Sequence, residues 1–123
     1  MVWNFSDDLP IYQQIMDIVK RQIATGEWKP GEKLPSVREM ALGAGVNPNT
    51  MQKALSEMER EGFLYSQRTA GRFVTEDKAI IKGLQEGLVV ECVDAFLKNM
   101  QELGFSIDEI IELIRKEEKK EEK

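Results

Sequence analysis

Four polar side chains suited to base recognition follow an Asn-Pro pair within one short segment. They are Asn49, Thr50, Gln52 and Lys53, and Asn47 precedes the proline. Asn and Gln can each form two hydrogen bonds with adenine, Lys reaches guanine or a phosphate, and Thr reaches a phosphate or a thymine methyl group. On one face of a helix, this set could therefore bind the major groove of duplex DNA. Any solvent-facing helix also carries polar residues, so the neighbouring elements must show whether this face binds DNA or is only solvated.

Three arginines accompany this segment. Arg38 precedes it, and Arg68 and Arg72 bracket a turn that contains Thr69 and Gly71. A guanidinium group can bind guanine or a phosphate through two parallel hydrogen bonds. A basic turn can lie along the DNA backbone or enter the minor groove. Each arginine could equally form a surface ion pair of little energy, so residue type alone does not assign its role.

The elements that must position these residues follow from caps and apolar periodicity. We expect a first helix from Pro10 to about Thr25, with Pro10 at its first position. A turn-rich link follows, with one short strand around Trp28. Ser36 and Glu39 have the spacing of a capping box, which predicts that a second helix opens at Ser36. A Gly-Ala-Gly run then ends this helix.

A third helix and a hairpin complete the predicted DNA-binding domain, called the reader below and spanning residues 1–76. Asn47 followed by Pro48 is a strong helix start, and Gly62 closes the helix. Its buried stripe is expected to contain Met51, Ala54, Leu55 and Met58. Residues 63–67 and 72–75 are predicted to be strands on either side of the basic turn. The pattern predicts a winged helix-turn-helix domain over residues 1–76, in a chain that is mainly α with a small β-wing.

A long apolar stripe dominates the remainder, residues 77–123. We expect one long helix to Leu103 and a last helix capped by Ser106 and Glu109. The terminal KEEKKEEK is predicted to be a solvated, frayed end. The stripe is wider than the last helix can cover, so we expect these two helices to be a dimerisation tail. Its predicted dimerisation residues are Ile81, Leu84, Leu88, Cys92, Phe96 and Met100.

Charge is distributed unevenly along the 123 residues. The net charge is −5, but residues 1–75 carry nine basic and nine acidic residues. The whole acidic excess therefore lies in residues 76–123, outside the predicted reader. We expect DNA affinity that depends strongly on salt and is carried by a local basic stripe. An acidic N-terminus, the lack of a long apolar run and a single cysteine favour a cytoplasmic protein without membrane contact.

Catalysis has little support in this sequence. Histidine, the usual general base and metal ligand, is absent. Cys92 falls on the apolar stripe and is interpreted as a packed small hydrophobe. No phosphate-binding loop or metal-spaced cluster occurs, so we expect no enzyme activity, no metal and no cofactor. Phe96 and Met100 could line a small-molecule pocket, although the unbroken stripe favours a helix–helix contact.

The combined motifs resemble the DNA-binding domain of GntR-family transcription regulators. The residues that carry the likeness are PIYQQIMDIVKRQIATGEWKPGEKLPS, LPSVREMA and GVNPNTMQKALSEMEREGFLYSQRTAGRFV, from about residue 8 to residue 76. The short tail with GFSIDEIIELI is similar to the YtrA-type subgroup. The resemblance implies a homodimer on an inverted-repeat operator, usually acting as a repressor. It also implies DNA contacts by Arg38, Asn49, Thr50, Gln52 and the wing from Arg68 to Gly71.

This chain departs from the family pattern at three positions. Many members carry arginine after the third helix's cap and again four residues later, where this chain has Pro48 and Gln52. Arg72 stands where the return strand of the wing often has a small residue or threonine. The base preference of arginine-bearing relatives therefore does not transfer.

Two interpretations follow from the residues. The first is a homodimeric DNA-binding transcription regulator, with double-stranded DNA as its partner. The alternative is a winged-helix module that binds a protein and little DNA, which the neutral charge of residues 1–75 keeps open. The tail is too short to enclose a metabolite within one protomer, so a small-molecule effector would have to bind at the dimer interface.

Overall fold

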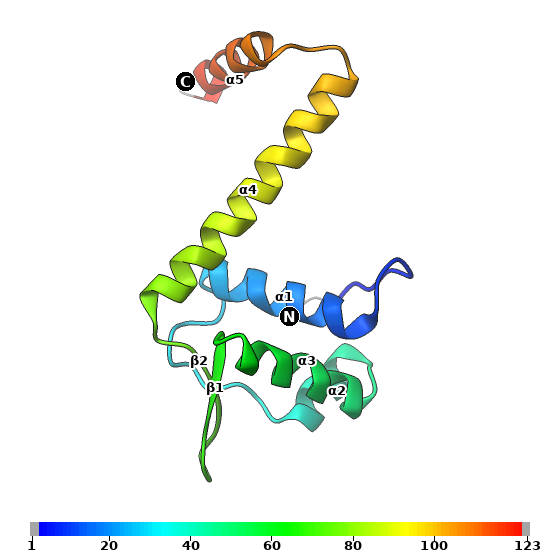
Figure 1. Cartoon of the computed structure of the whole chain (residues 1–123), viewed down its shortest axis with the longest axis vertical. Helices are drawn as coiled ribbons and strands as arrows, with labels where there is room; N and C mark the ends of the chain where they lie inside the picture. Colours follow the sequence, from blue (N-terminus) through cyan, green and yellow to red (C-terminus); the bar gives the residue numbers. More distant parts are fainter. Residues whose placement is uncertain (1–2, 122–123) are drawn as a thin grey trace. The chain divides into compact units, whose positions relative to one another are not determined.

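The computed structural model describes residues 3–121 and, in that range, contains five helices and one two-stranded antiparallel sheet. The chain divides between Gln85 and Glu86 into two compact units. In chain order, the elements are α1 (Ile11–Thr25), α2 (Val37–Ala44), α3 (Pro48–Arg60), β1 (Leu64–Gln67), β2 (Gly71–Val74), α4 (Lys78–Glu102) and α5 (Ile107–Glu121) (Figure 1). The first unit ends within α4, and the second contains the rest of α4 and α5. The predicted fold class is confirmed.

The first helix, α1, has the predicted extent, with one difference at its start. Pro10 occupies the N-cap position with extended backbone (φ −54°, ψ 141°) and is not the first helical residue. Gly26 follows the last turn in the left-handed region at φ 86°, where a residue without a Cβ atom is favoured. Ile15, Val19 and Ile23 form a fully or nearly fully buried face.

The expected short strand around Trp28 is wrong. Trp28 lies in a bend after α1, and its indole N–H donates to Oε1 of Gln22 at 2.7 Å. The extended pairing occurs farther along the link, where the amide of Leu34 donates to the carbonyl of Arg72 at 2.9 Å. Lys33 also forms an isolated bridge with β2. The position of β2 in three dimensions therefore decides which part of the link is extended, and local sequence does not encode that position.

The caps of α2 and α3 are confirmed. The Ser36 hydroxyl oxygen accepts a hydrogen bond from the amide of Glu39 at 3.1 Å, and the same hydroxyl donates to Oε1 of Glu39. The second arm of this capping box thus joins two side chains and does not reach the Ser36 amide. At α3, Oδ1 of Asn47 accepts from the amide of Asn49 at 2.8 Å, and Pro48 is the first helical residue.

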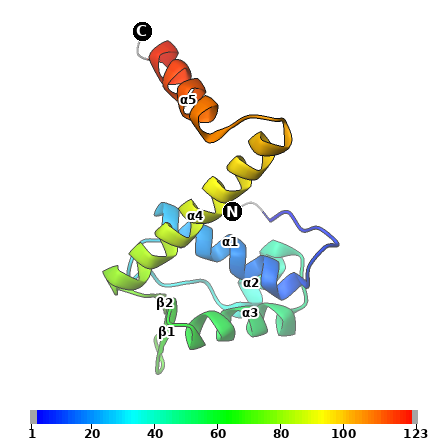
Figure 2. The same cartoon turned by 45° about the horizontal axis from the view of Figure 1, so that its top comes forward.

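The centre of the first unit is α3. Its four predicted core residues, Met51, Ala54, Leu55 and Met58, all have 0% exposure. Both α1 and α2 pack against α3, as the two ribbon views show (Figure 2). Because this face is buried, the opposite face of α3 is the one presented to solvent.

The hairpin β1–β2 forms the predicted wing. Its register pairs Leu64 with Val74 at the base and Gln67 with Gly71 at the end. Leu64 and Val74 are 2% and 0% exposed, so the base of the wing is part of the core. The three-residue loop contains Thr69 at φ 70°, a left-handed conformation that is uncommon for a residue other than glycine.

Apolar side chains of α4 are largely uncovered within the second unit. Val89, Val90, Val93 and Phe96 are 41–60% exposed, and Cys92 is also exposed. Among the described residues of this unit, the buried apolar residue is Ile110 of α5, which is 1% exposed. Thus α4 is an exposed apolar helix in the single chain, a situation that usually marks a contact surface.

The second capping box closes fully. The amide of Ser106 donates to Oε1 of Glu109 at 3.0 Å, and the Glu109 amide donates to Oγ of Ser106 at 3.2 Å. The helix continues to Glu121, and its last described residues are exposed, as expected for a solvated tail. Residues 122 and 123 of that tail lie outside the described range. In residues 3–121, no helix has the length and apolar character needed to cross a bilayer.

Candidate nucleic-acid interface

The predicted reading residues of α3 lie on its exposed face. Asn49, Gln52 and Lys53 are exposed, and Thr50 is half-buried. The side-chain amide of Gln52 donates to Oγ of Ser56 at 2.9 Å, one turn along the helix. This bond orients the Gln52 amide before any ligand arrives. The first two turns of α3 therefore present hydrogen-bonding groups in the way a major-groove helix requires.

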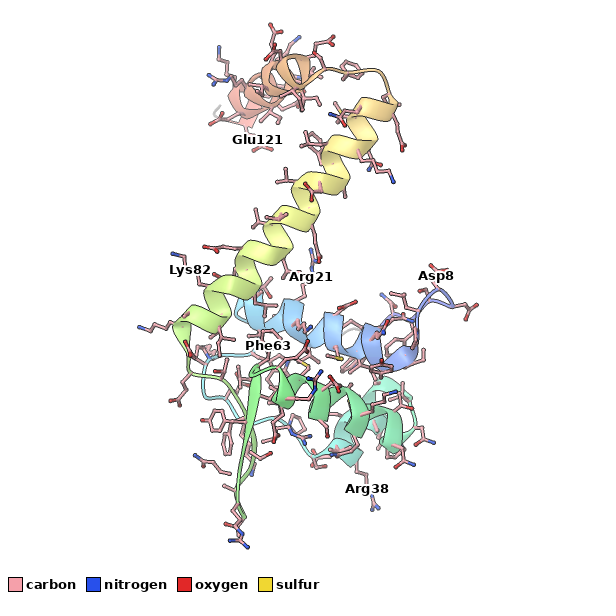
Figure 3. All side chains as sticks on the ribbon, in the orientation of Figure 1. Asp8, Arg21, Arg38, Phe63, Lys82 and Glu121 are labelled. Carbon is pink, nitrogen blue, oxygen red and sulfur yellow. The ribbon has the colours of Figure 1, made fainter. Side chains whose placement is uncertain are left out.

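Arg38 is free to reach a ligand. It lies in the first turn of α2, is exposed, and takes no part in the ion pairs of the described chain. Its side chain points away from the helices, in the direction in which the wing extends (Figure 3). The surface ion pair considered from the sequence is thus not formed, and the guanidinium keeps all of its donors available.

Lys53 is held by an aromatic ring of α1. Its Nζ atom lies 3.9 Å from the centroid of the Tyr12 ring, which is close enough for a cation–π contact. The contact limits the conformational freedom of the long Lys53 side chain. Less of that freedom then remains to be lost when the side chain binds DNA. The sequence did not reveal this partnership, because Tyr12 lies in a different helix.

The two wing arginines differ in their surroundings. Arg68 lies at the exposed turn with Thr69. Arg72 is only 18% exposed, and its Nε donates to Oε1 of Glu59 on α3 at 3.1 Å. Arg72 is therefore the predicted DNA-contacting residue that already forms an ion pair within the described chain.

A cleft of about 860 Å³ opens between the start of α2, the exposed face of α3 and the wing. Predicted residues Gln52, Thr69, Gly71 and Arg72 line it. Lys33 also lines it and was missed by sequence reasoning, because a lysine in a Pro- and Gly-rich link carries no positional signal. A Cβ atom on Gly71 would lie 2.9 Å from Cε of Lys33, so Gly71 leaves room for this side chain to cross the wing.

The predicted dimerisation residues fall into two groups. Ile81 and Leu84 are half-buried and pack against the core of the first unit. Leu88 and Met100 are half-buried, whereas Cys92 and Phe96 are exposed. The list from the sequence omitted three exposed valines of the same helix, Val89, Val90 and Val93. A signal was present for two of them, because Val89 and Val93 form a second row beside the main stripe.

The second unit also contains an apolar groove. It has a volume of about 560 Å³ and lies between α4 and α5. Phe96, Met100, Ile110, Leu113 and Ile114 supply its apolar walls, and glutamates of α5 stand at its edge. Phe96 and Met100 thus line a groove that is open in the single chain.

Comparison with known proteins identifies the family. Residues 11–74 match the family described as bacterial regulatory proteins, gntR family. The HTH-type transcriptional regulator YhcF of Bacillus subtilis, itself uncharacterised, is 43% identical over 91% of this chain and 93% of its own length. A GntR family transcriptional regulator from Listeria monocytogenes superposes with a TM-score of 0.81, at 38% identity over 91% of this chain and 98% of that one.

Several of the similar structures contain operator DNA. The DNA-binding domain of AraR, solved in complex with operator ORR3, has a TM-score of 0.53 and 29% identity, and covers 61% of this chain and 90% of that domain. Its likeness covers a part of this chain about as long as the reader. With the winged helix-turn-helix and its exposed polar face in place, this chain belongs to the gntR family of bacterial regulatory proteins and is a DNA-binding transcription regulator.

Proposed function

We propose that the protein acts as a homodimer on an inverted-repeat operator and represses transcription there. The observation that supports dimerisation is the uncovered apolar face of α4, where Val89, Val90, Val93 and Phe96 are 41–60% exposed. Covering this face with a second copy removes apolar area from water, at about 25 cal/mol per Å². A twofold pair then presents two reading helices to one DNA duplex. A dimer bound across a promoter would exclude polymerase.

The proposed DNA contacts come from three places in the first unit. The start of α2 contributes Arg38, and the wing contributes Arg68, Thr69 and Gly71. The first turns of α3 contribute Asn47, Asn49, Thr50, Gln52 and Lys53. Exposure supports this assignment, because all of these residues except Thr50 are exposed. Arg72, the remaining predicted contact, is already bound to Glu59.

A small-molecule effector at the dimer interface stays a prediction. The groove between α4 and α5, at about 560 Å³, is within the size range of small-molecule sites. Its apolar walls suit a partner helix equally well. We propose that the partner protomer covers the groove, so that an effector would compete with or reinforce the dimer contact.

The operator is expected to be an inverted repeat with half-site centres about one helical turn, ~10 bp, apart. This spacing follows from two reading helices related by a twofold axis. Selection from random duplexes, followed by hydroxyl-radical footprinting, measures both the sequence and its symmetry. A single asymmetric half-site protected at saturating protein would contradict the dimeric reader.

Lys53→Ala is expected to weaken binding to all duplexes alike and to lower the salt slope of log K by about one per protomer. The reason is that Lys53 is proposed to neutralise a phosphate and to release its counterion. Titrations over a salt series measure the slope. Lys82→Ala removes an exposed lysine of α4 and serves as the control, because it should leave the slope unchanged. Equal slopes for the wild type and Lys53→Ala would exclude the phosphate contact.

A further inference from the structure

One carboxylate oxygen of α3 receives two side chains of the wing. The Ser66 hydroxyl donates to Oε1 of Glu59 at 2.6 Å, and Nε of Arg72 donates to the same oxygen at 3.1 Å. Ser66 and Arg72 are direct partners in the β1–β2 register. Glu59 therefore binds both strands of the hairpin at a single cross-strand pair.

This pair lies in the outer half of the wing, beyond the part that the core holds. Leu64 and Val74 anchor the base, but none of the residues from Ser66 to Arg72, all of which the structure describes, is buried. The backbone bond from Leu34 fixes β2 at Arg72 but does not reach α3. The Glu59 contact is thus a direct polar link between the reading helix and the outer wing.

The chemistry of the Glu59 contact suits a group that holds the wing in a fixed position. The Ser66 hydroxyl, followed by the Arg72 guanidinium, holds the pKa of Glu59 below its ordinary value, so the carboxylate is ionised at neutral pH. A hydrogen bond with an ionised acceptor is shorter and stronger than a neutral one. Arg72 is 18% exposed, against 72% for Arg60, which lies on the same helix as Glu59 and forms a surface pair. Arg72 is therefore mostly engaged within the protein.

We propose that Glu59, Ser66 and Arg72 are positioning residues, which fix the angle of the wing relative to α3 so that Arg68 and Thr69 meet the DNA backbone. The proposal rests on the DNA contacts proposed above. It assigns Arg72 a role that acts through Glu59 and not through a phosphate. Arginine at this strand position thus takes the place of the small residue or threonine common in the family pattern.

Arg72 could either bind a phosphate or position the wing, and the direction in which Glu59→Gln changes operator affinity distinguishes these two roles. If Arg72 binds a phosphate, Glu59→Gln removes a competing anion and releases the arginine, so operator affinity should stay equal or rise. If Arg72 positions the wing, the same substitution weakens the contact between α3 and the wing. Operator affinity should then fall, although the protein loses a negative charge. We expect a fall of about fivefold, as for a partly exposed ion pair.

A matched control lies two residues away on the same helix. Glu57→Gln removes the same charge from α3, but Glu57 pairs with Arg60 and not with the wing. Its affinity should equal or exceed that of the wild type. Ser66→Ala changes no charge and should weaken binding in the same direction as Glu59→Gln. Thermal unfolding of each full-length variant checks that the fold is retained.

The experiment is hydroxyl-radical footprinting and titration of the full-length protein on its selected operator. In Glu59→Gln, protection should be lost at the nucleotides that the wing contacts in the wild type and should persist at the bases read by α3. The double variant Glu59→Gln/Arg72→Ala should lose less affinity than the sum of the two single losses, because both substitutions act on the same contact. Equal or tighter binding by Glu59→Gln, with an unchanged footprint, would overturn the positioning role. Failure of the wild-type protein to bind any duplex would instead overturn the proposed DNA contacts.

Discussion

Val93→Asp is expected to turn the protein into a monomer whose operator affinity is lower by at least about a hundredfold. Val93 is 47% exposed in the single chain, so an aspartate there remains hydrated and should not destabilise the protomer. In a dimer that buries α4, the same charge would lie unpaired in an apolar contact, at a cost of several kcal/mol. Loss of the dimer also removes the high effective concentration of the second half-site, which contributes a factor of about 10² to 10⁴.

Sedimentation of the full-length protein and DNA titration measure the two effects together. Asn99→Asp adds the same single charge at an exposed polar position of α4 and serves as the matched control. It should remain dimeric and bind as the wild type does. A wild-type monomer at micromolar concentration, or a Val93→Asp dimer with full affinity, would mean that the α4 face has another partner.

Arg38→Ala is expected to cost about 1–3 kcal/mol per half-site and to relax the base preference at one position of each. The reason is that Arg38 is exposed, takes no part in the ion pairs of the described chain, and points in the direction in which the wing extends. Arg38→Lys keeps the charge but loses the planar fork that binds guanine through two hydrogen bonds. Selection from random duplexes with each variant measures preference and affinity together.

The Arg38→Lys variant shows whether Arg38 contacts guanine or a phosphate. If Arg38 reads guanine, both substitutions should relax the same position, because neither side chain can reproduce the two parallel hydrogen bonds. If Arg38 binds a phosphate, Arg38→Lys should retain most of the affinity with an unchanged sequence preference. An Arg38→Ala protein with wild-type affinity and selectivity would remove α2 from the interface.

Local signals predicted the elements of the reader well, because those signals act within a few residues. The Asn47 cap with Pro48 set the start of α3, and helical spacing identified its buried face. The strand expected around Trp28 was wrong for the opposite reason. Extended backbone in the link is selected by pairing with β2, about forty residues away in sequence, and no local pattern records that partner.

The candidate interface was predictable only in part. Residue types on α3 and α2 indicated which side chains could meet DNA, because an exposed helical face follows from its buried one. The contacts that orient those side chains were not predictable. Tyr12 with Lys53, and Glu59 with Arg72, each join two elements whose approach depends on the packed core. Lys33 was missed because its place beside Gly71 depends on how the link crosses the wing.

If the uncovered face of α4 forms the proposed dimer contact, operator binding depends on the amount of protein in the cell. While most protomers are single, the concentration of a dimer rises with the square of total protein. Operator occupancy would then change more steeply than protein abundance, so a modest change in synthesis or degradation would move the target promoter between its two states. A protein of 123 residues could in this way produce a threshold response through its own apolar helix.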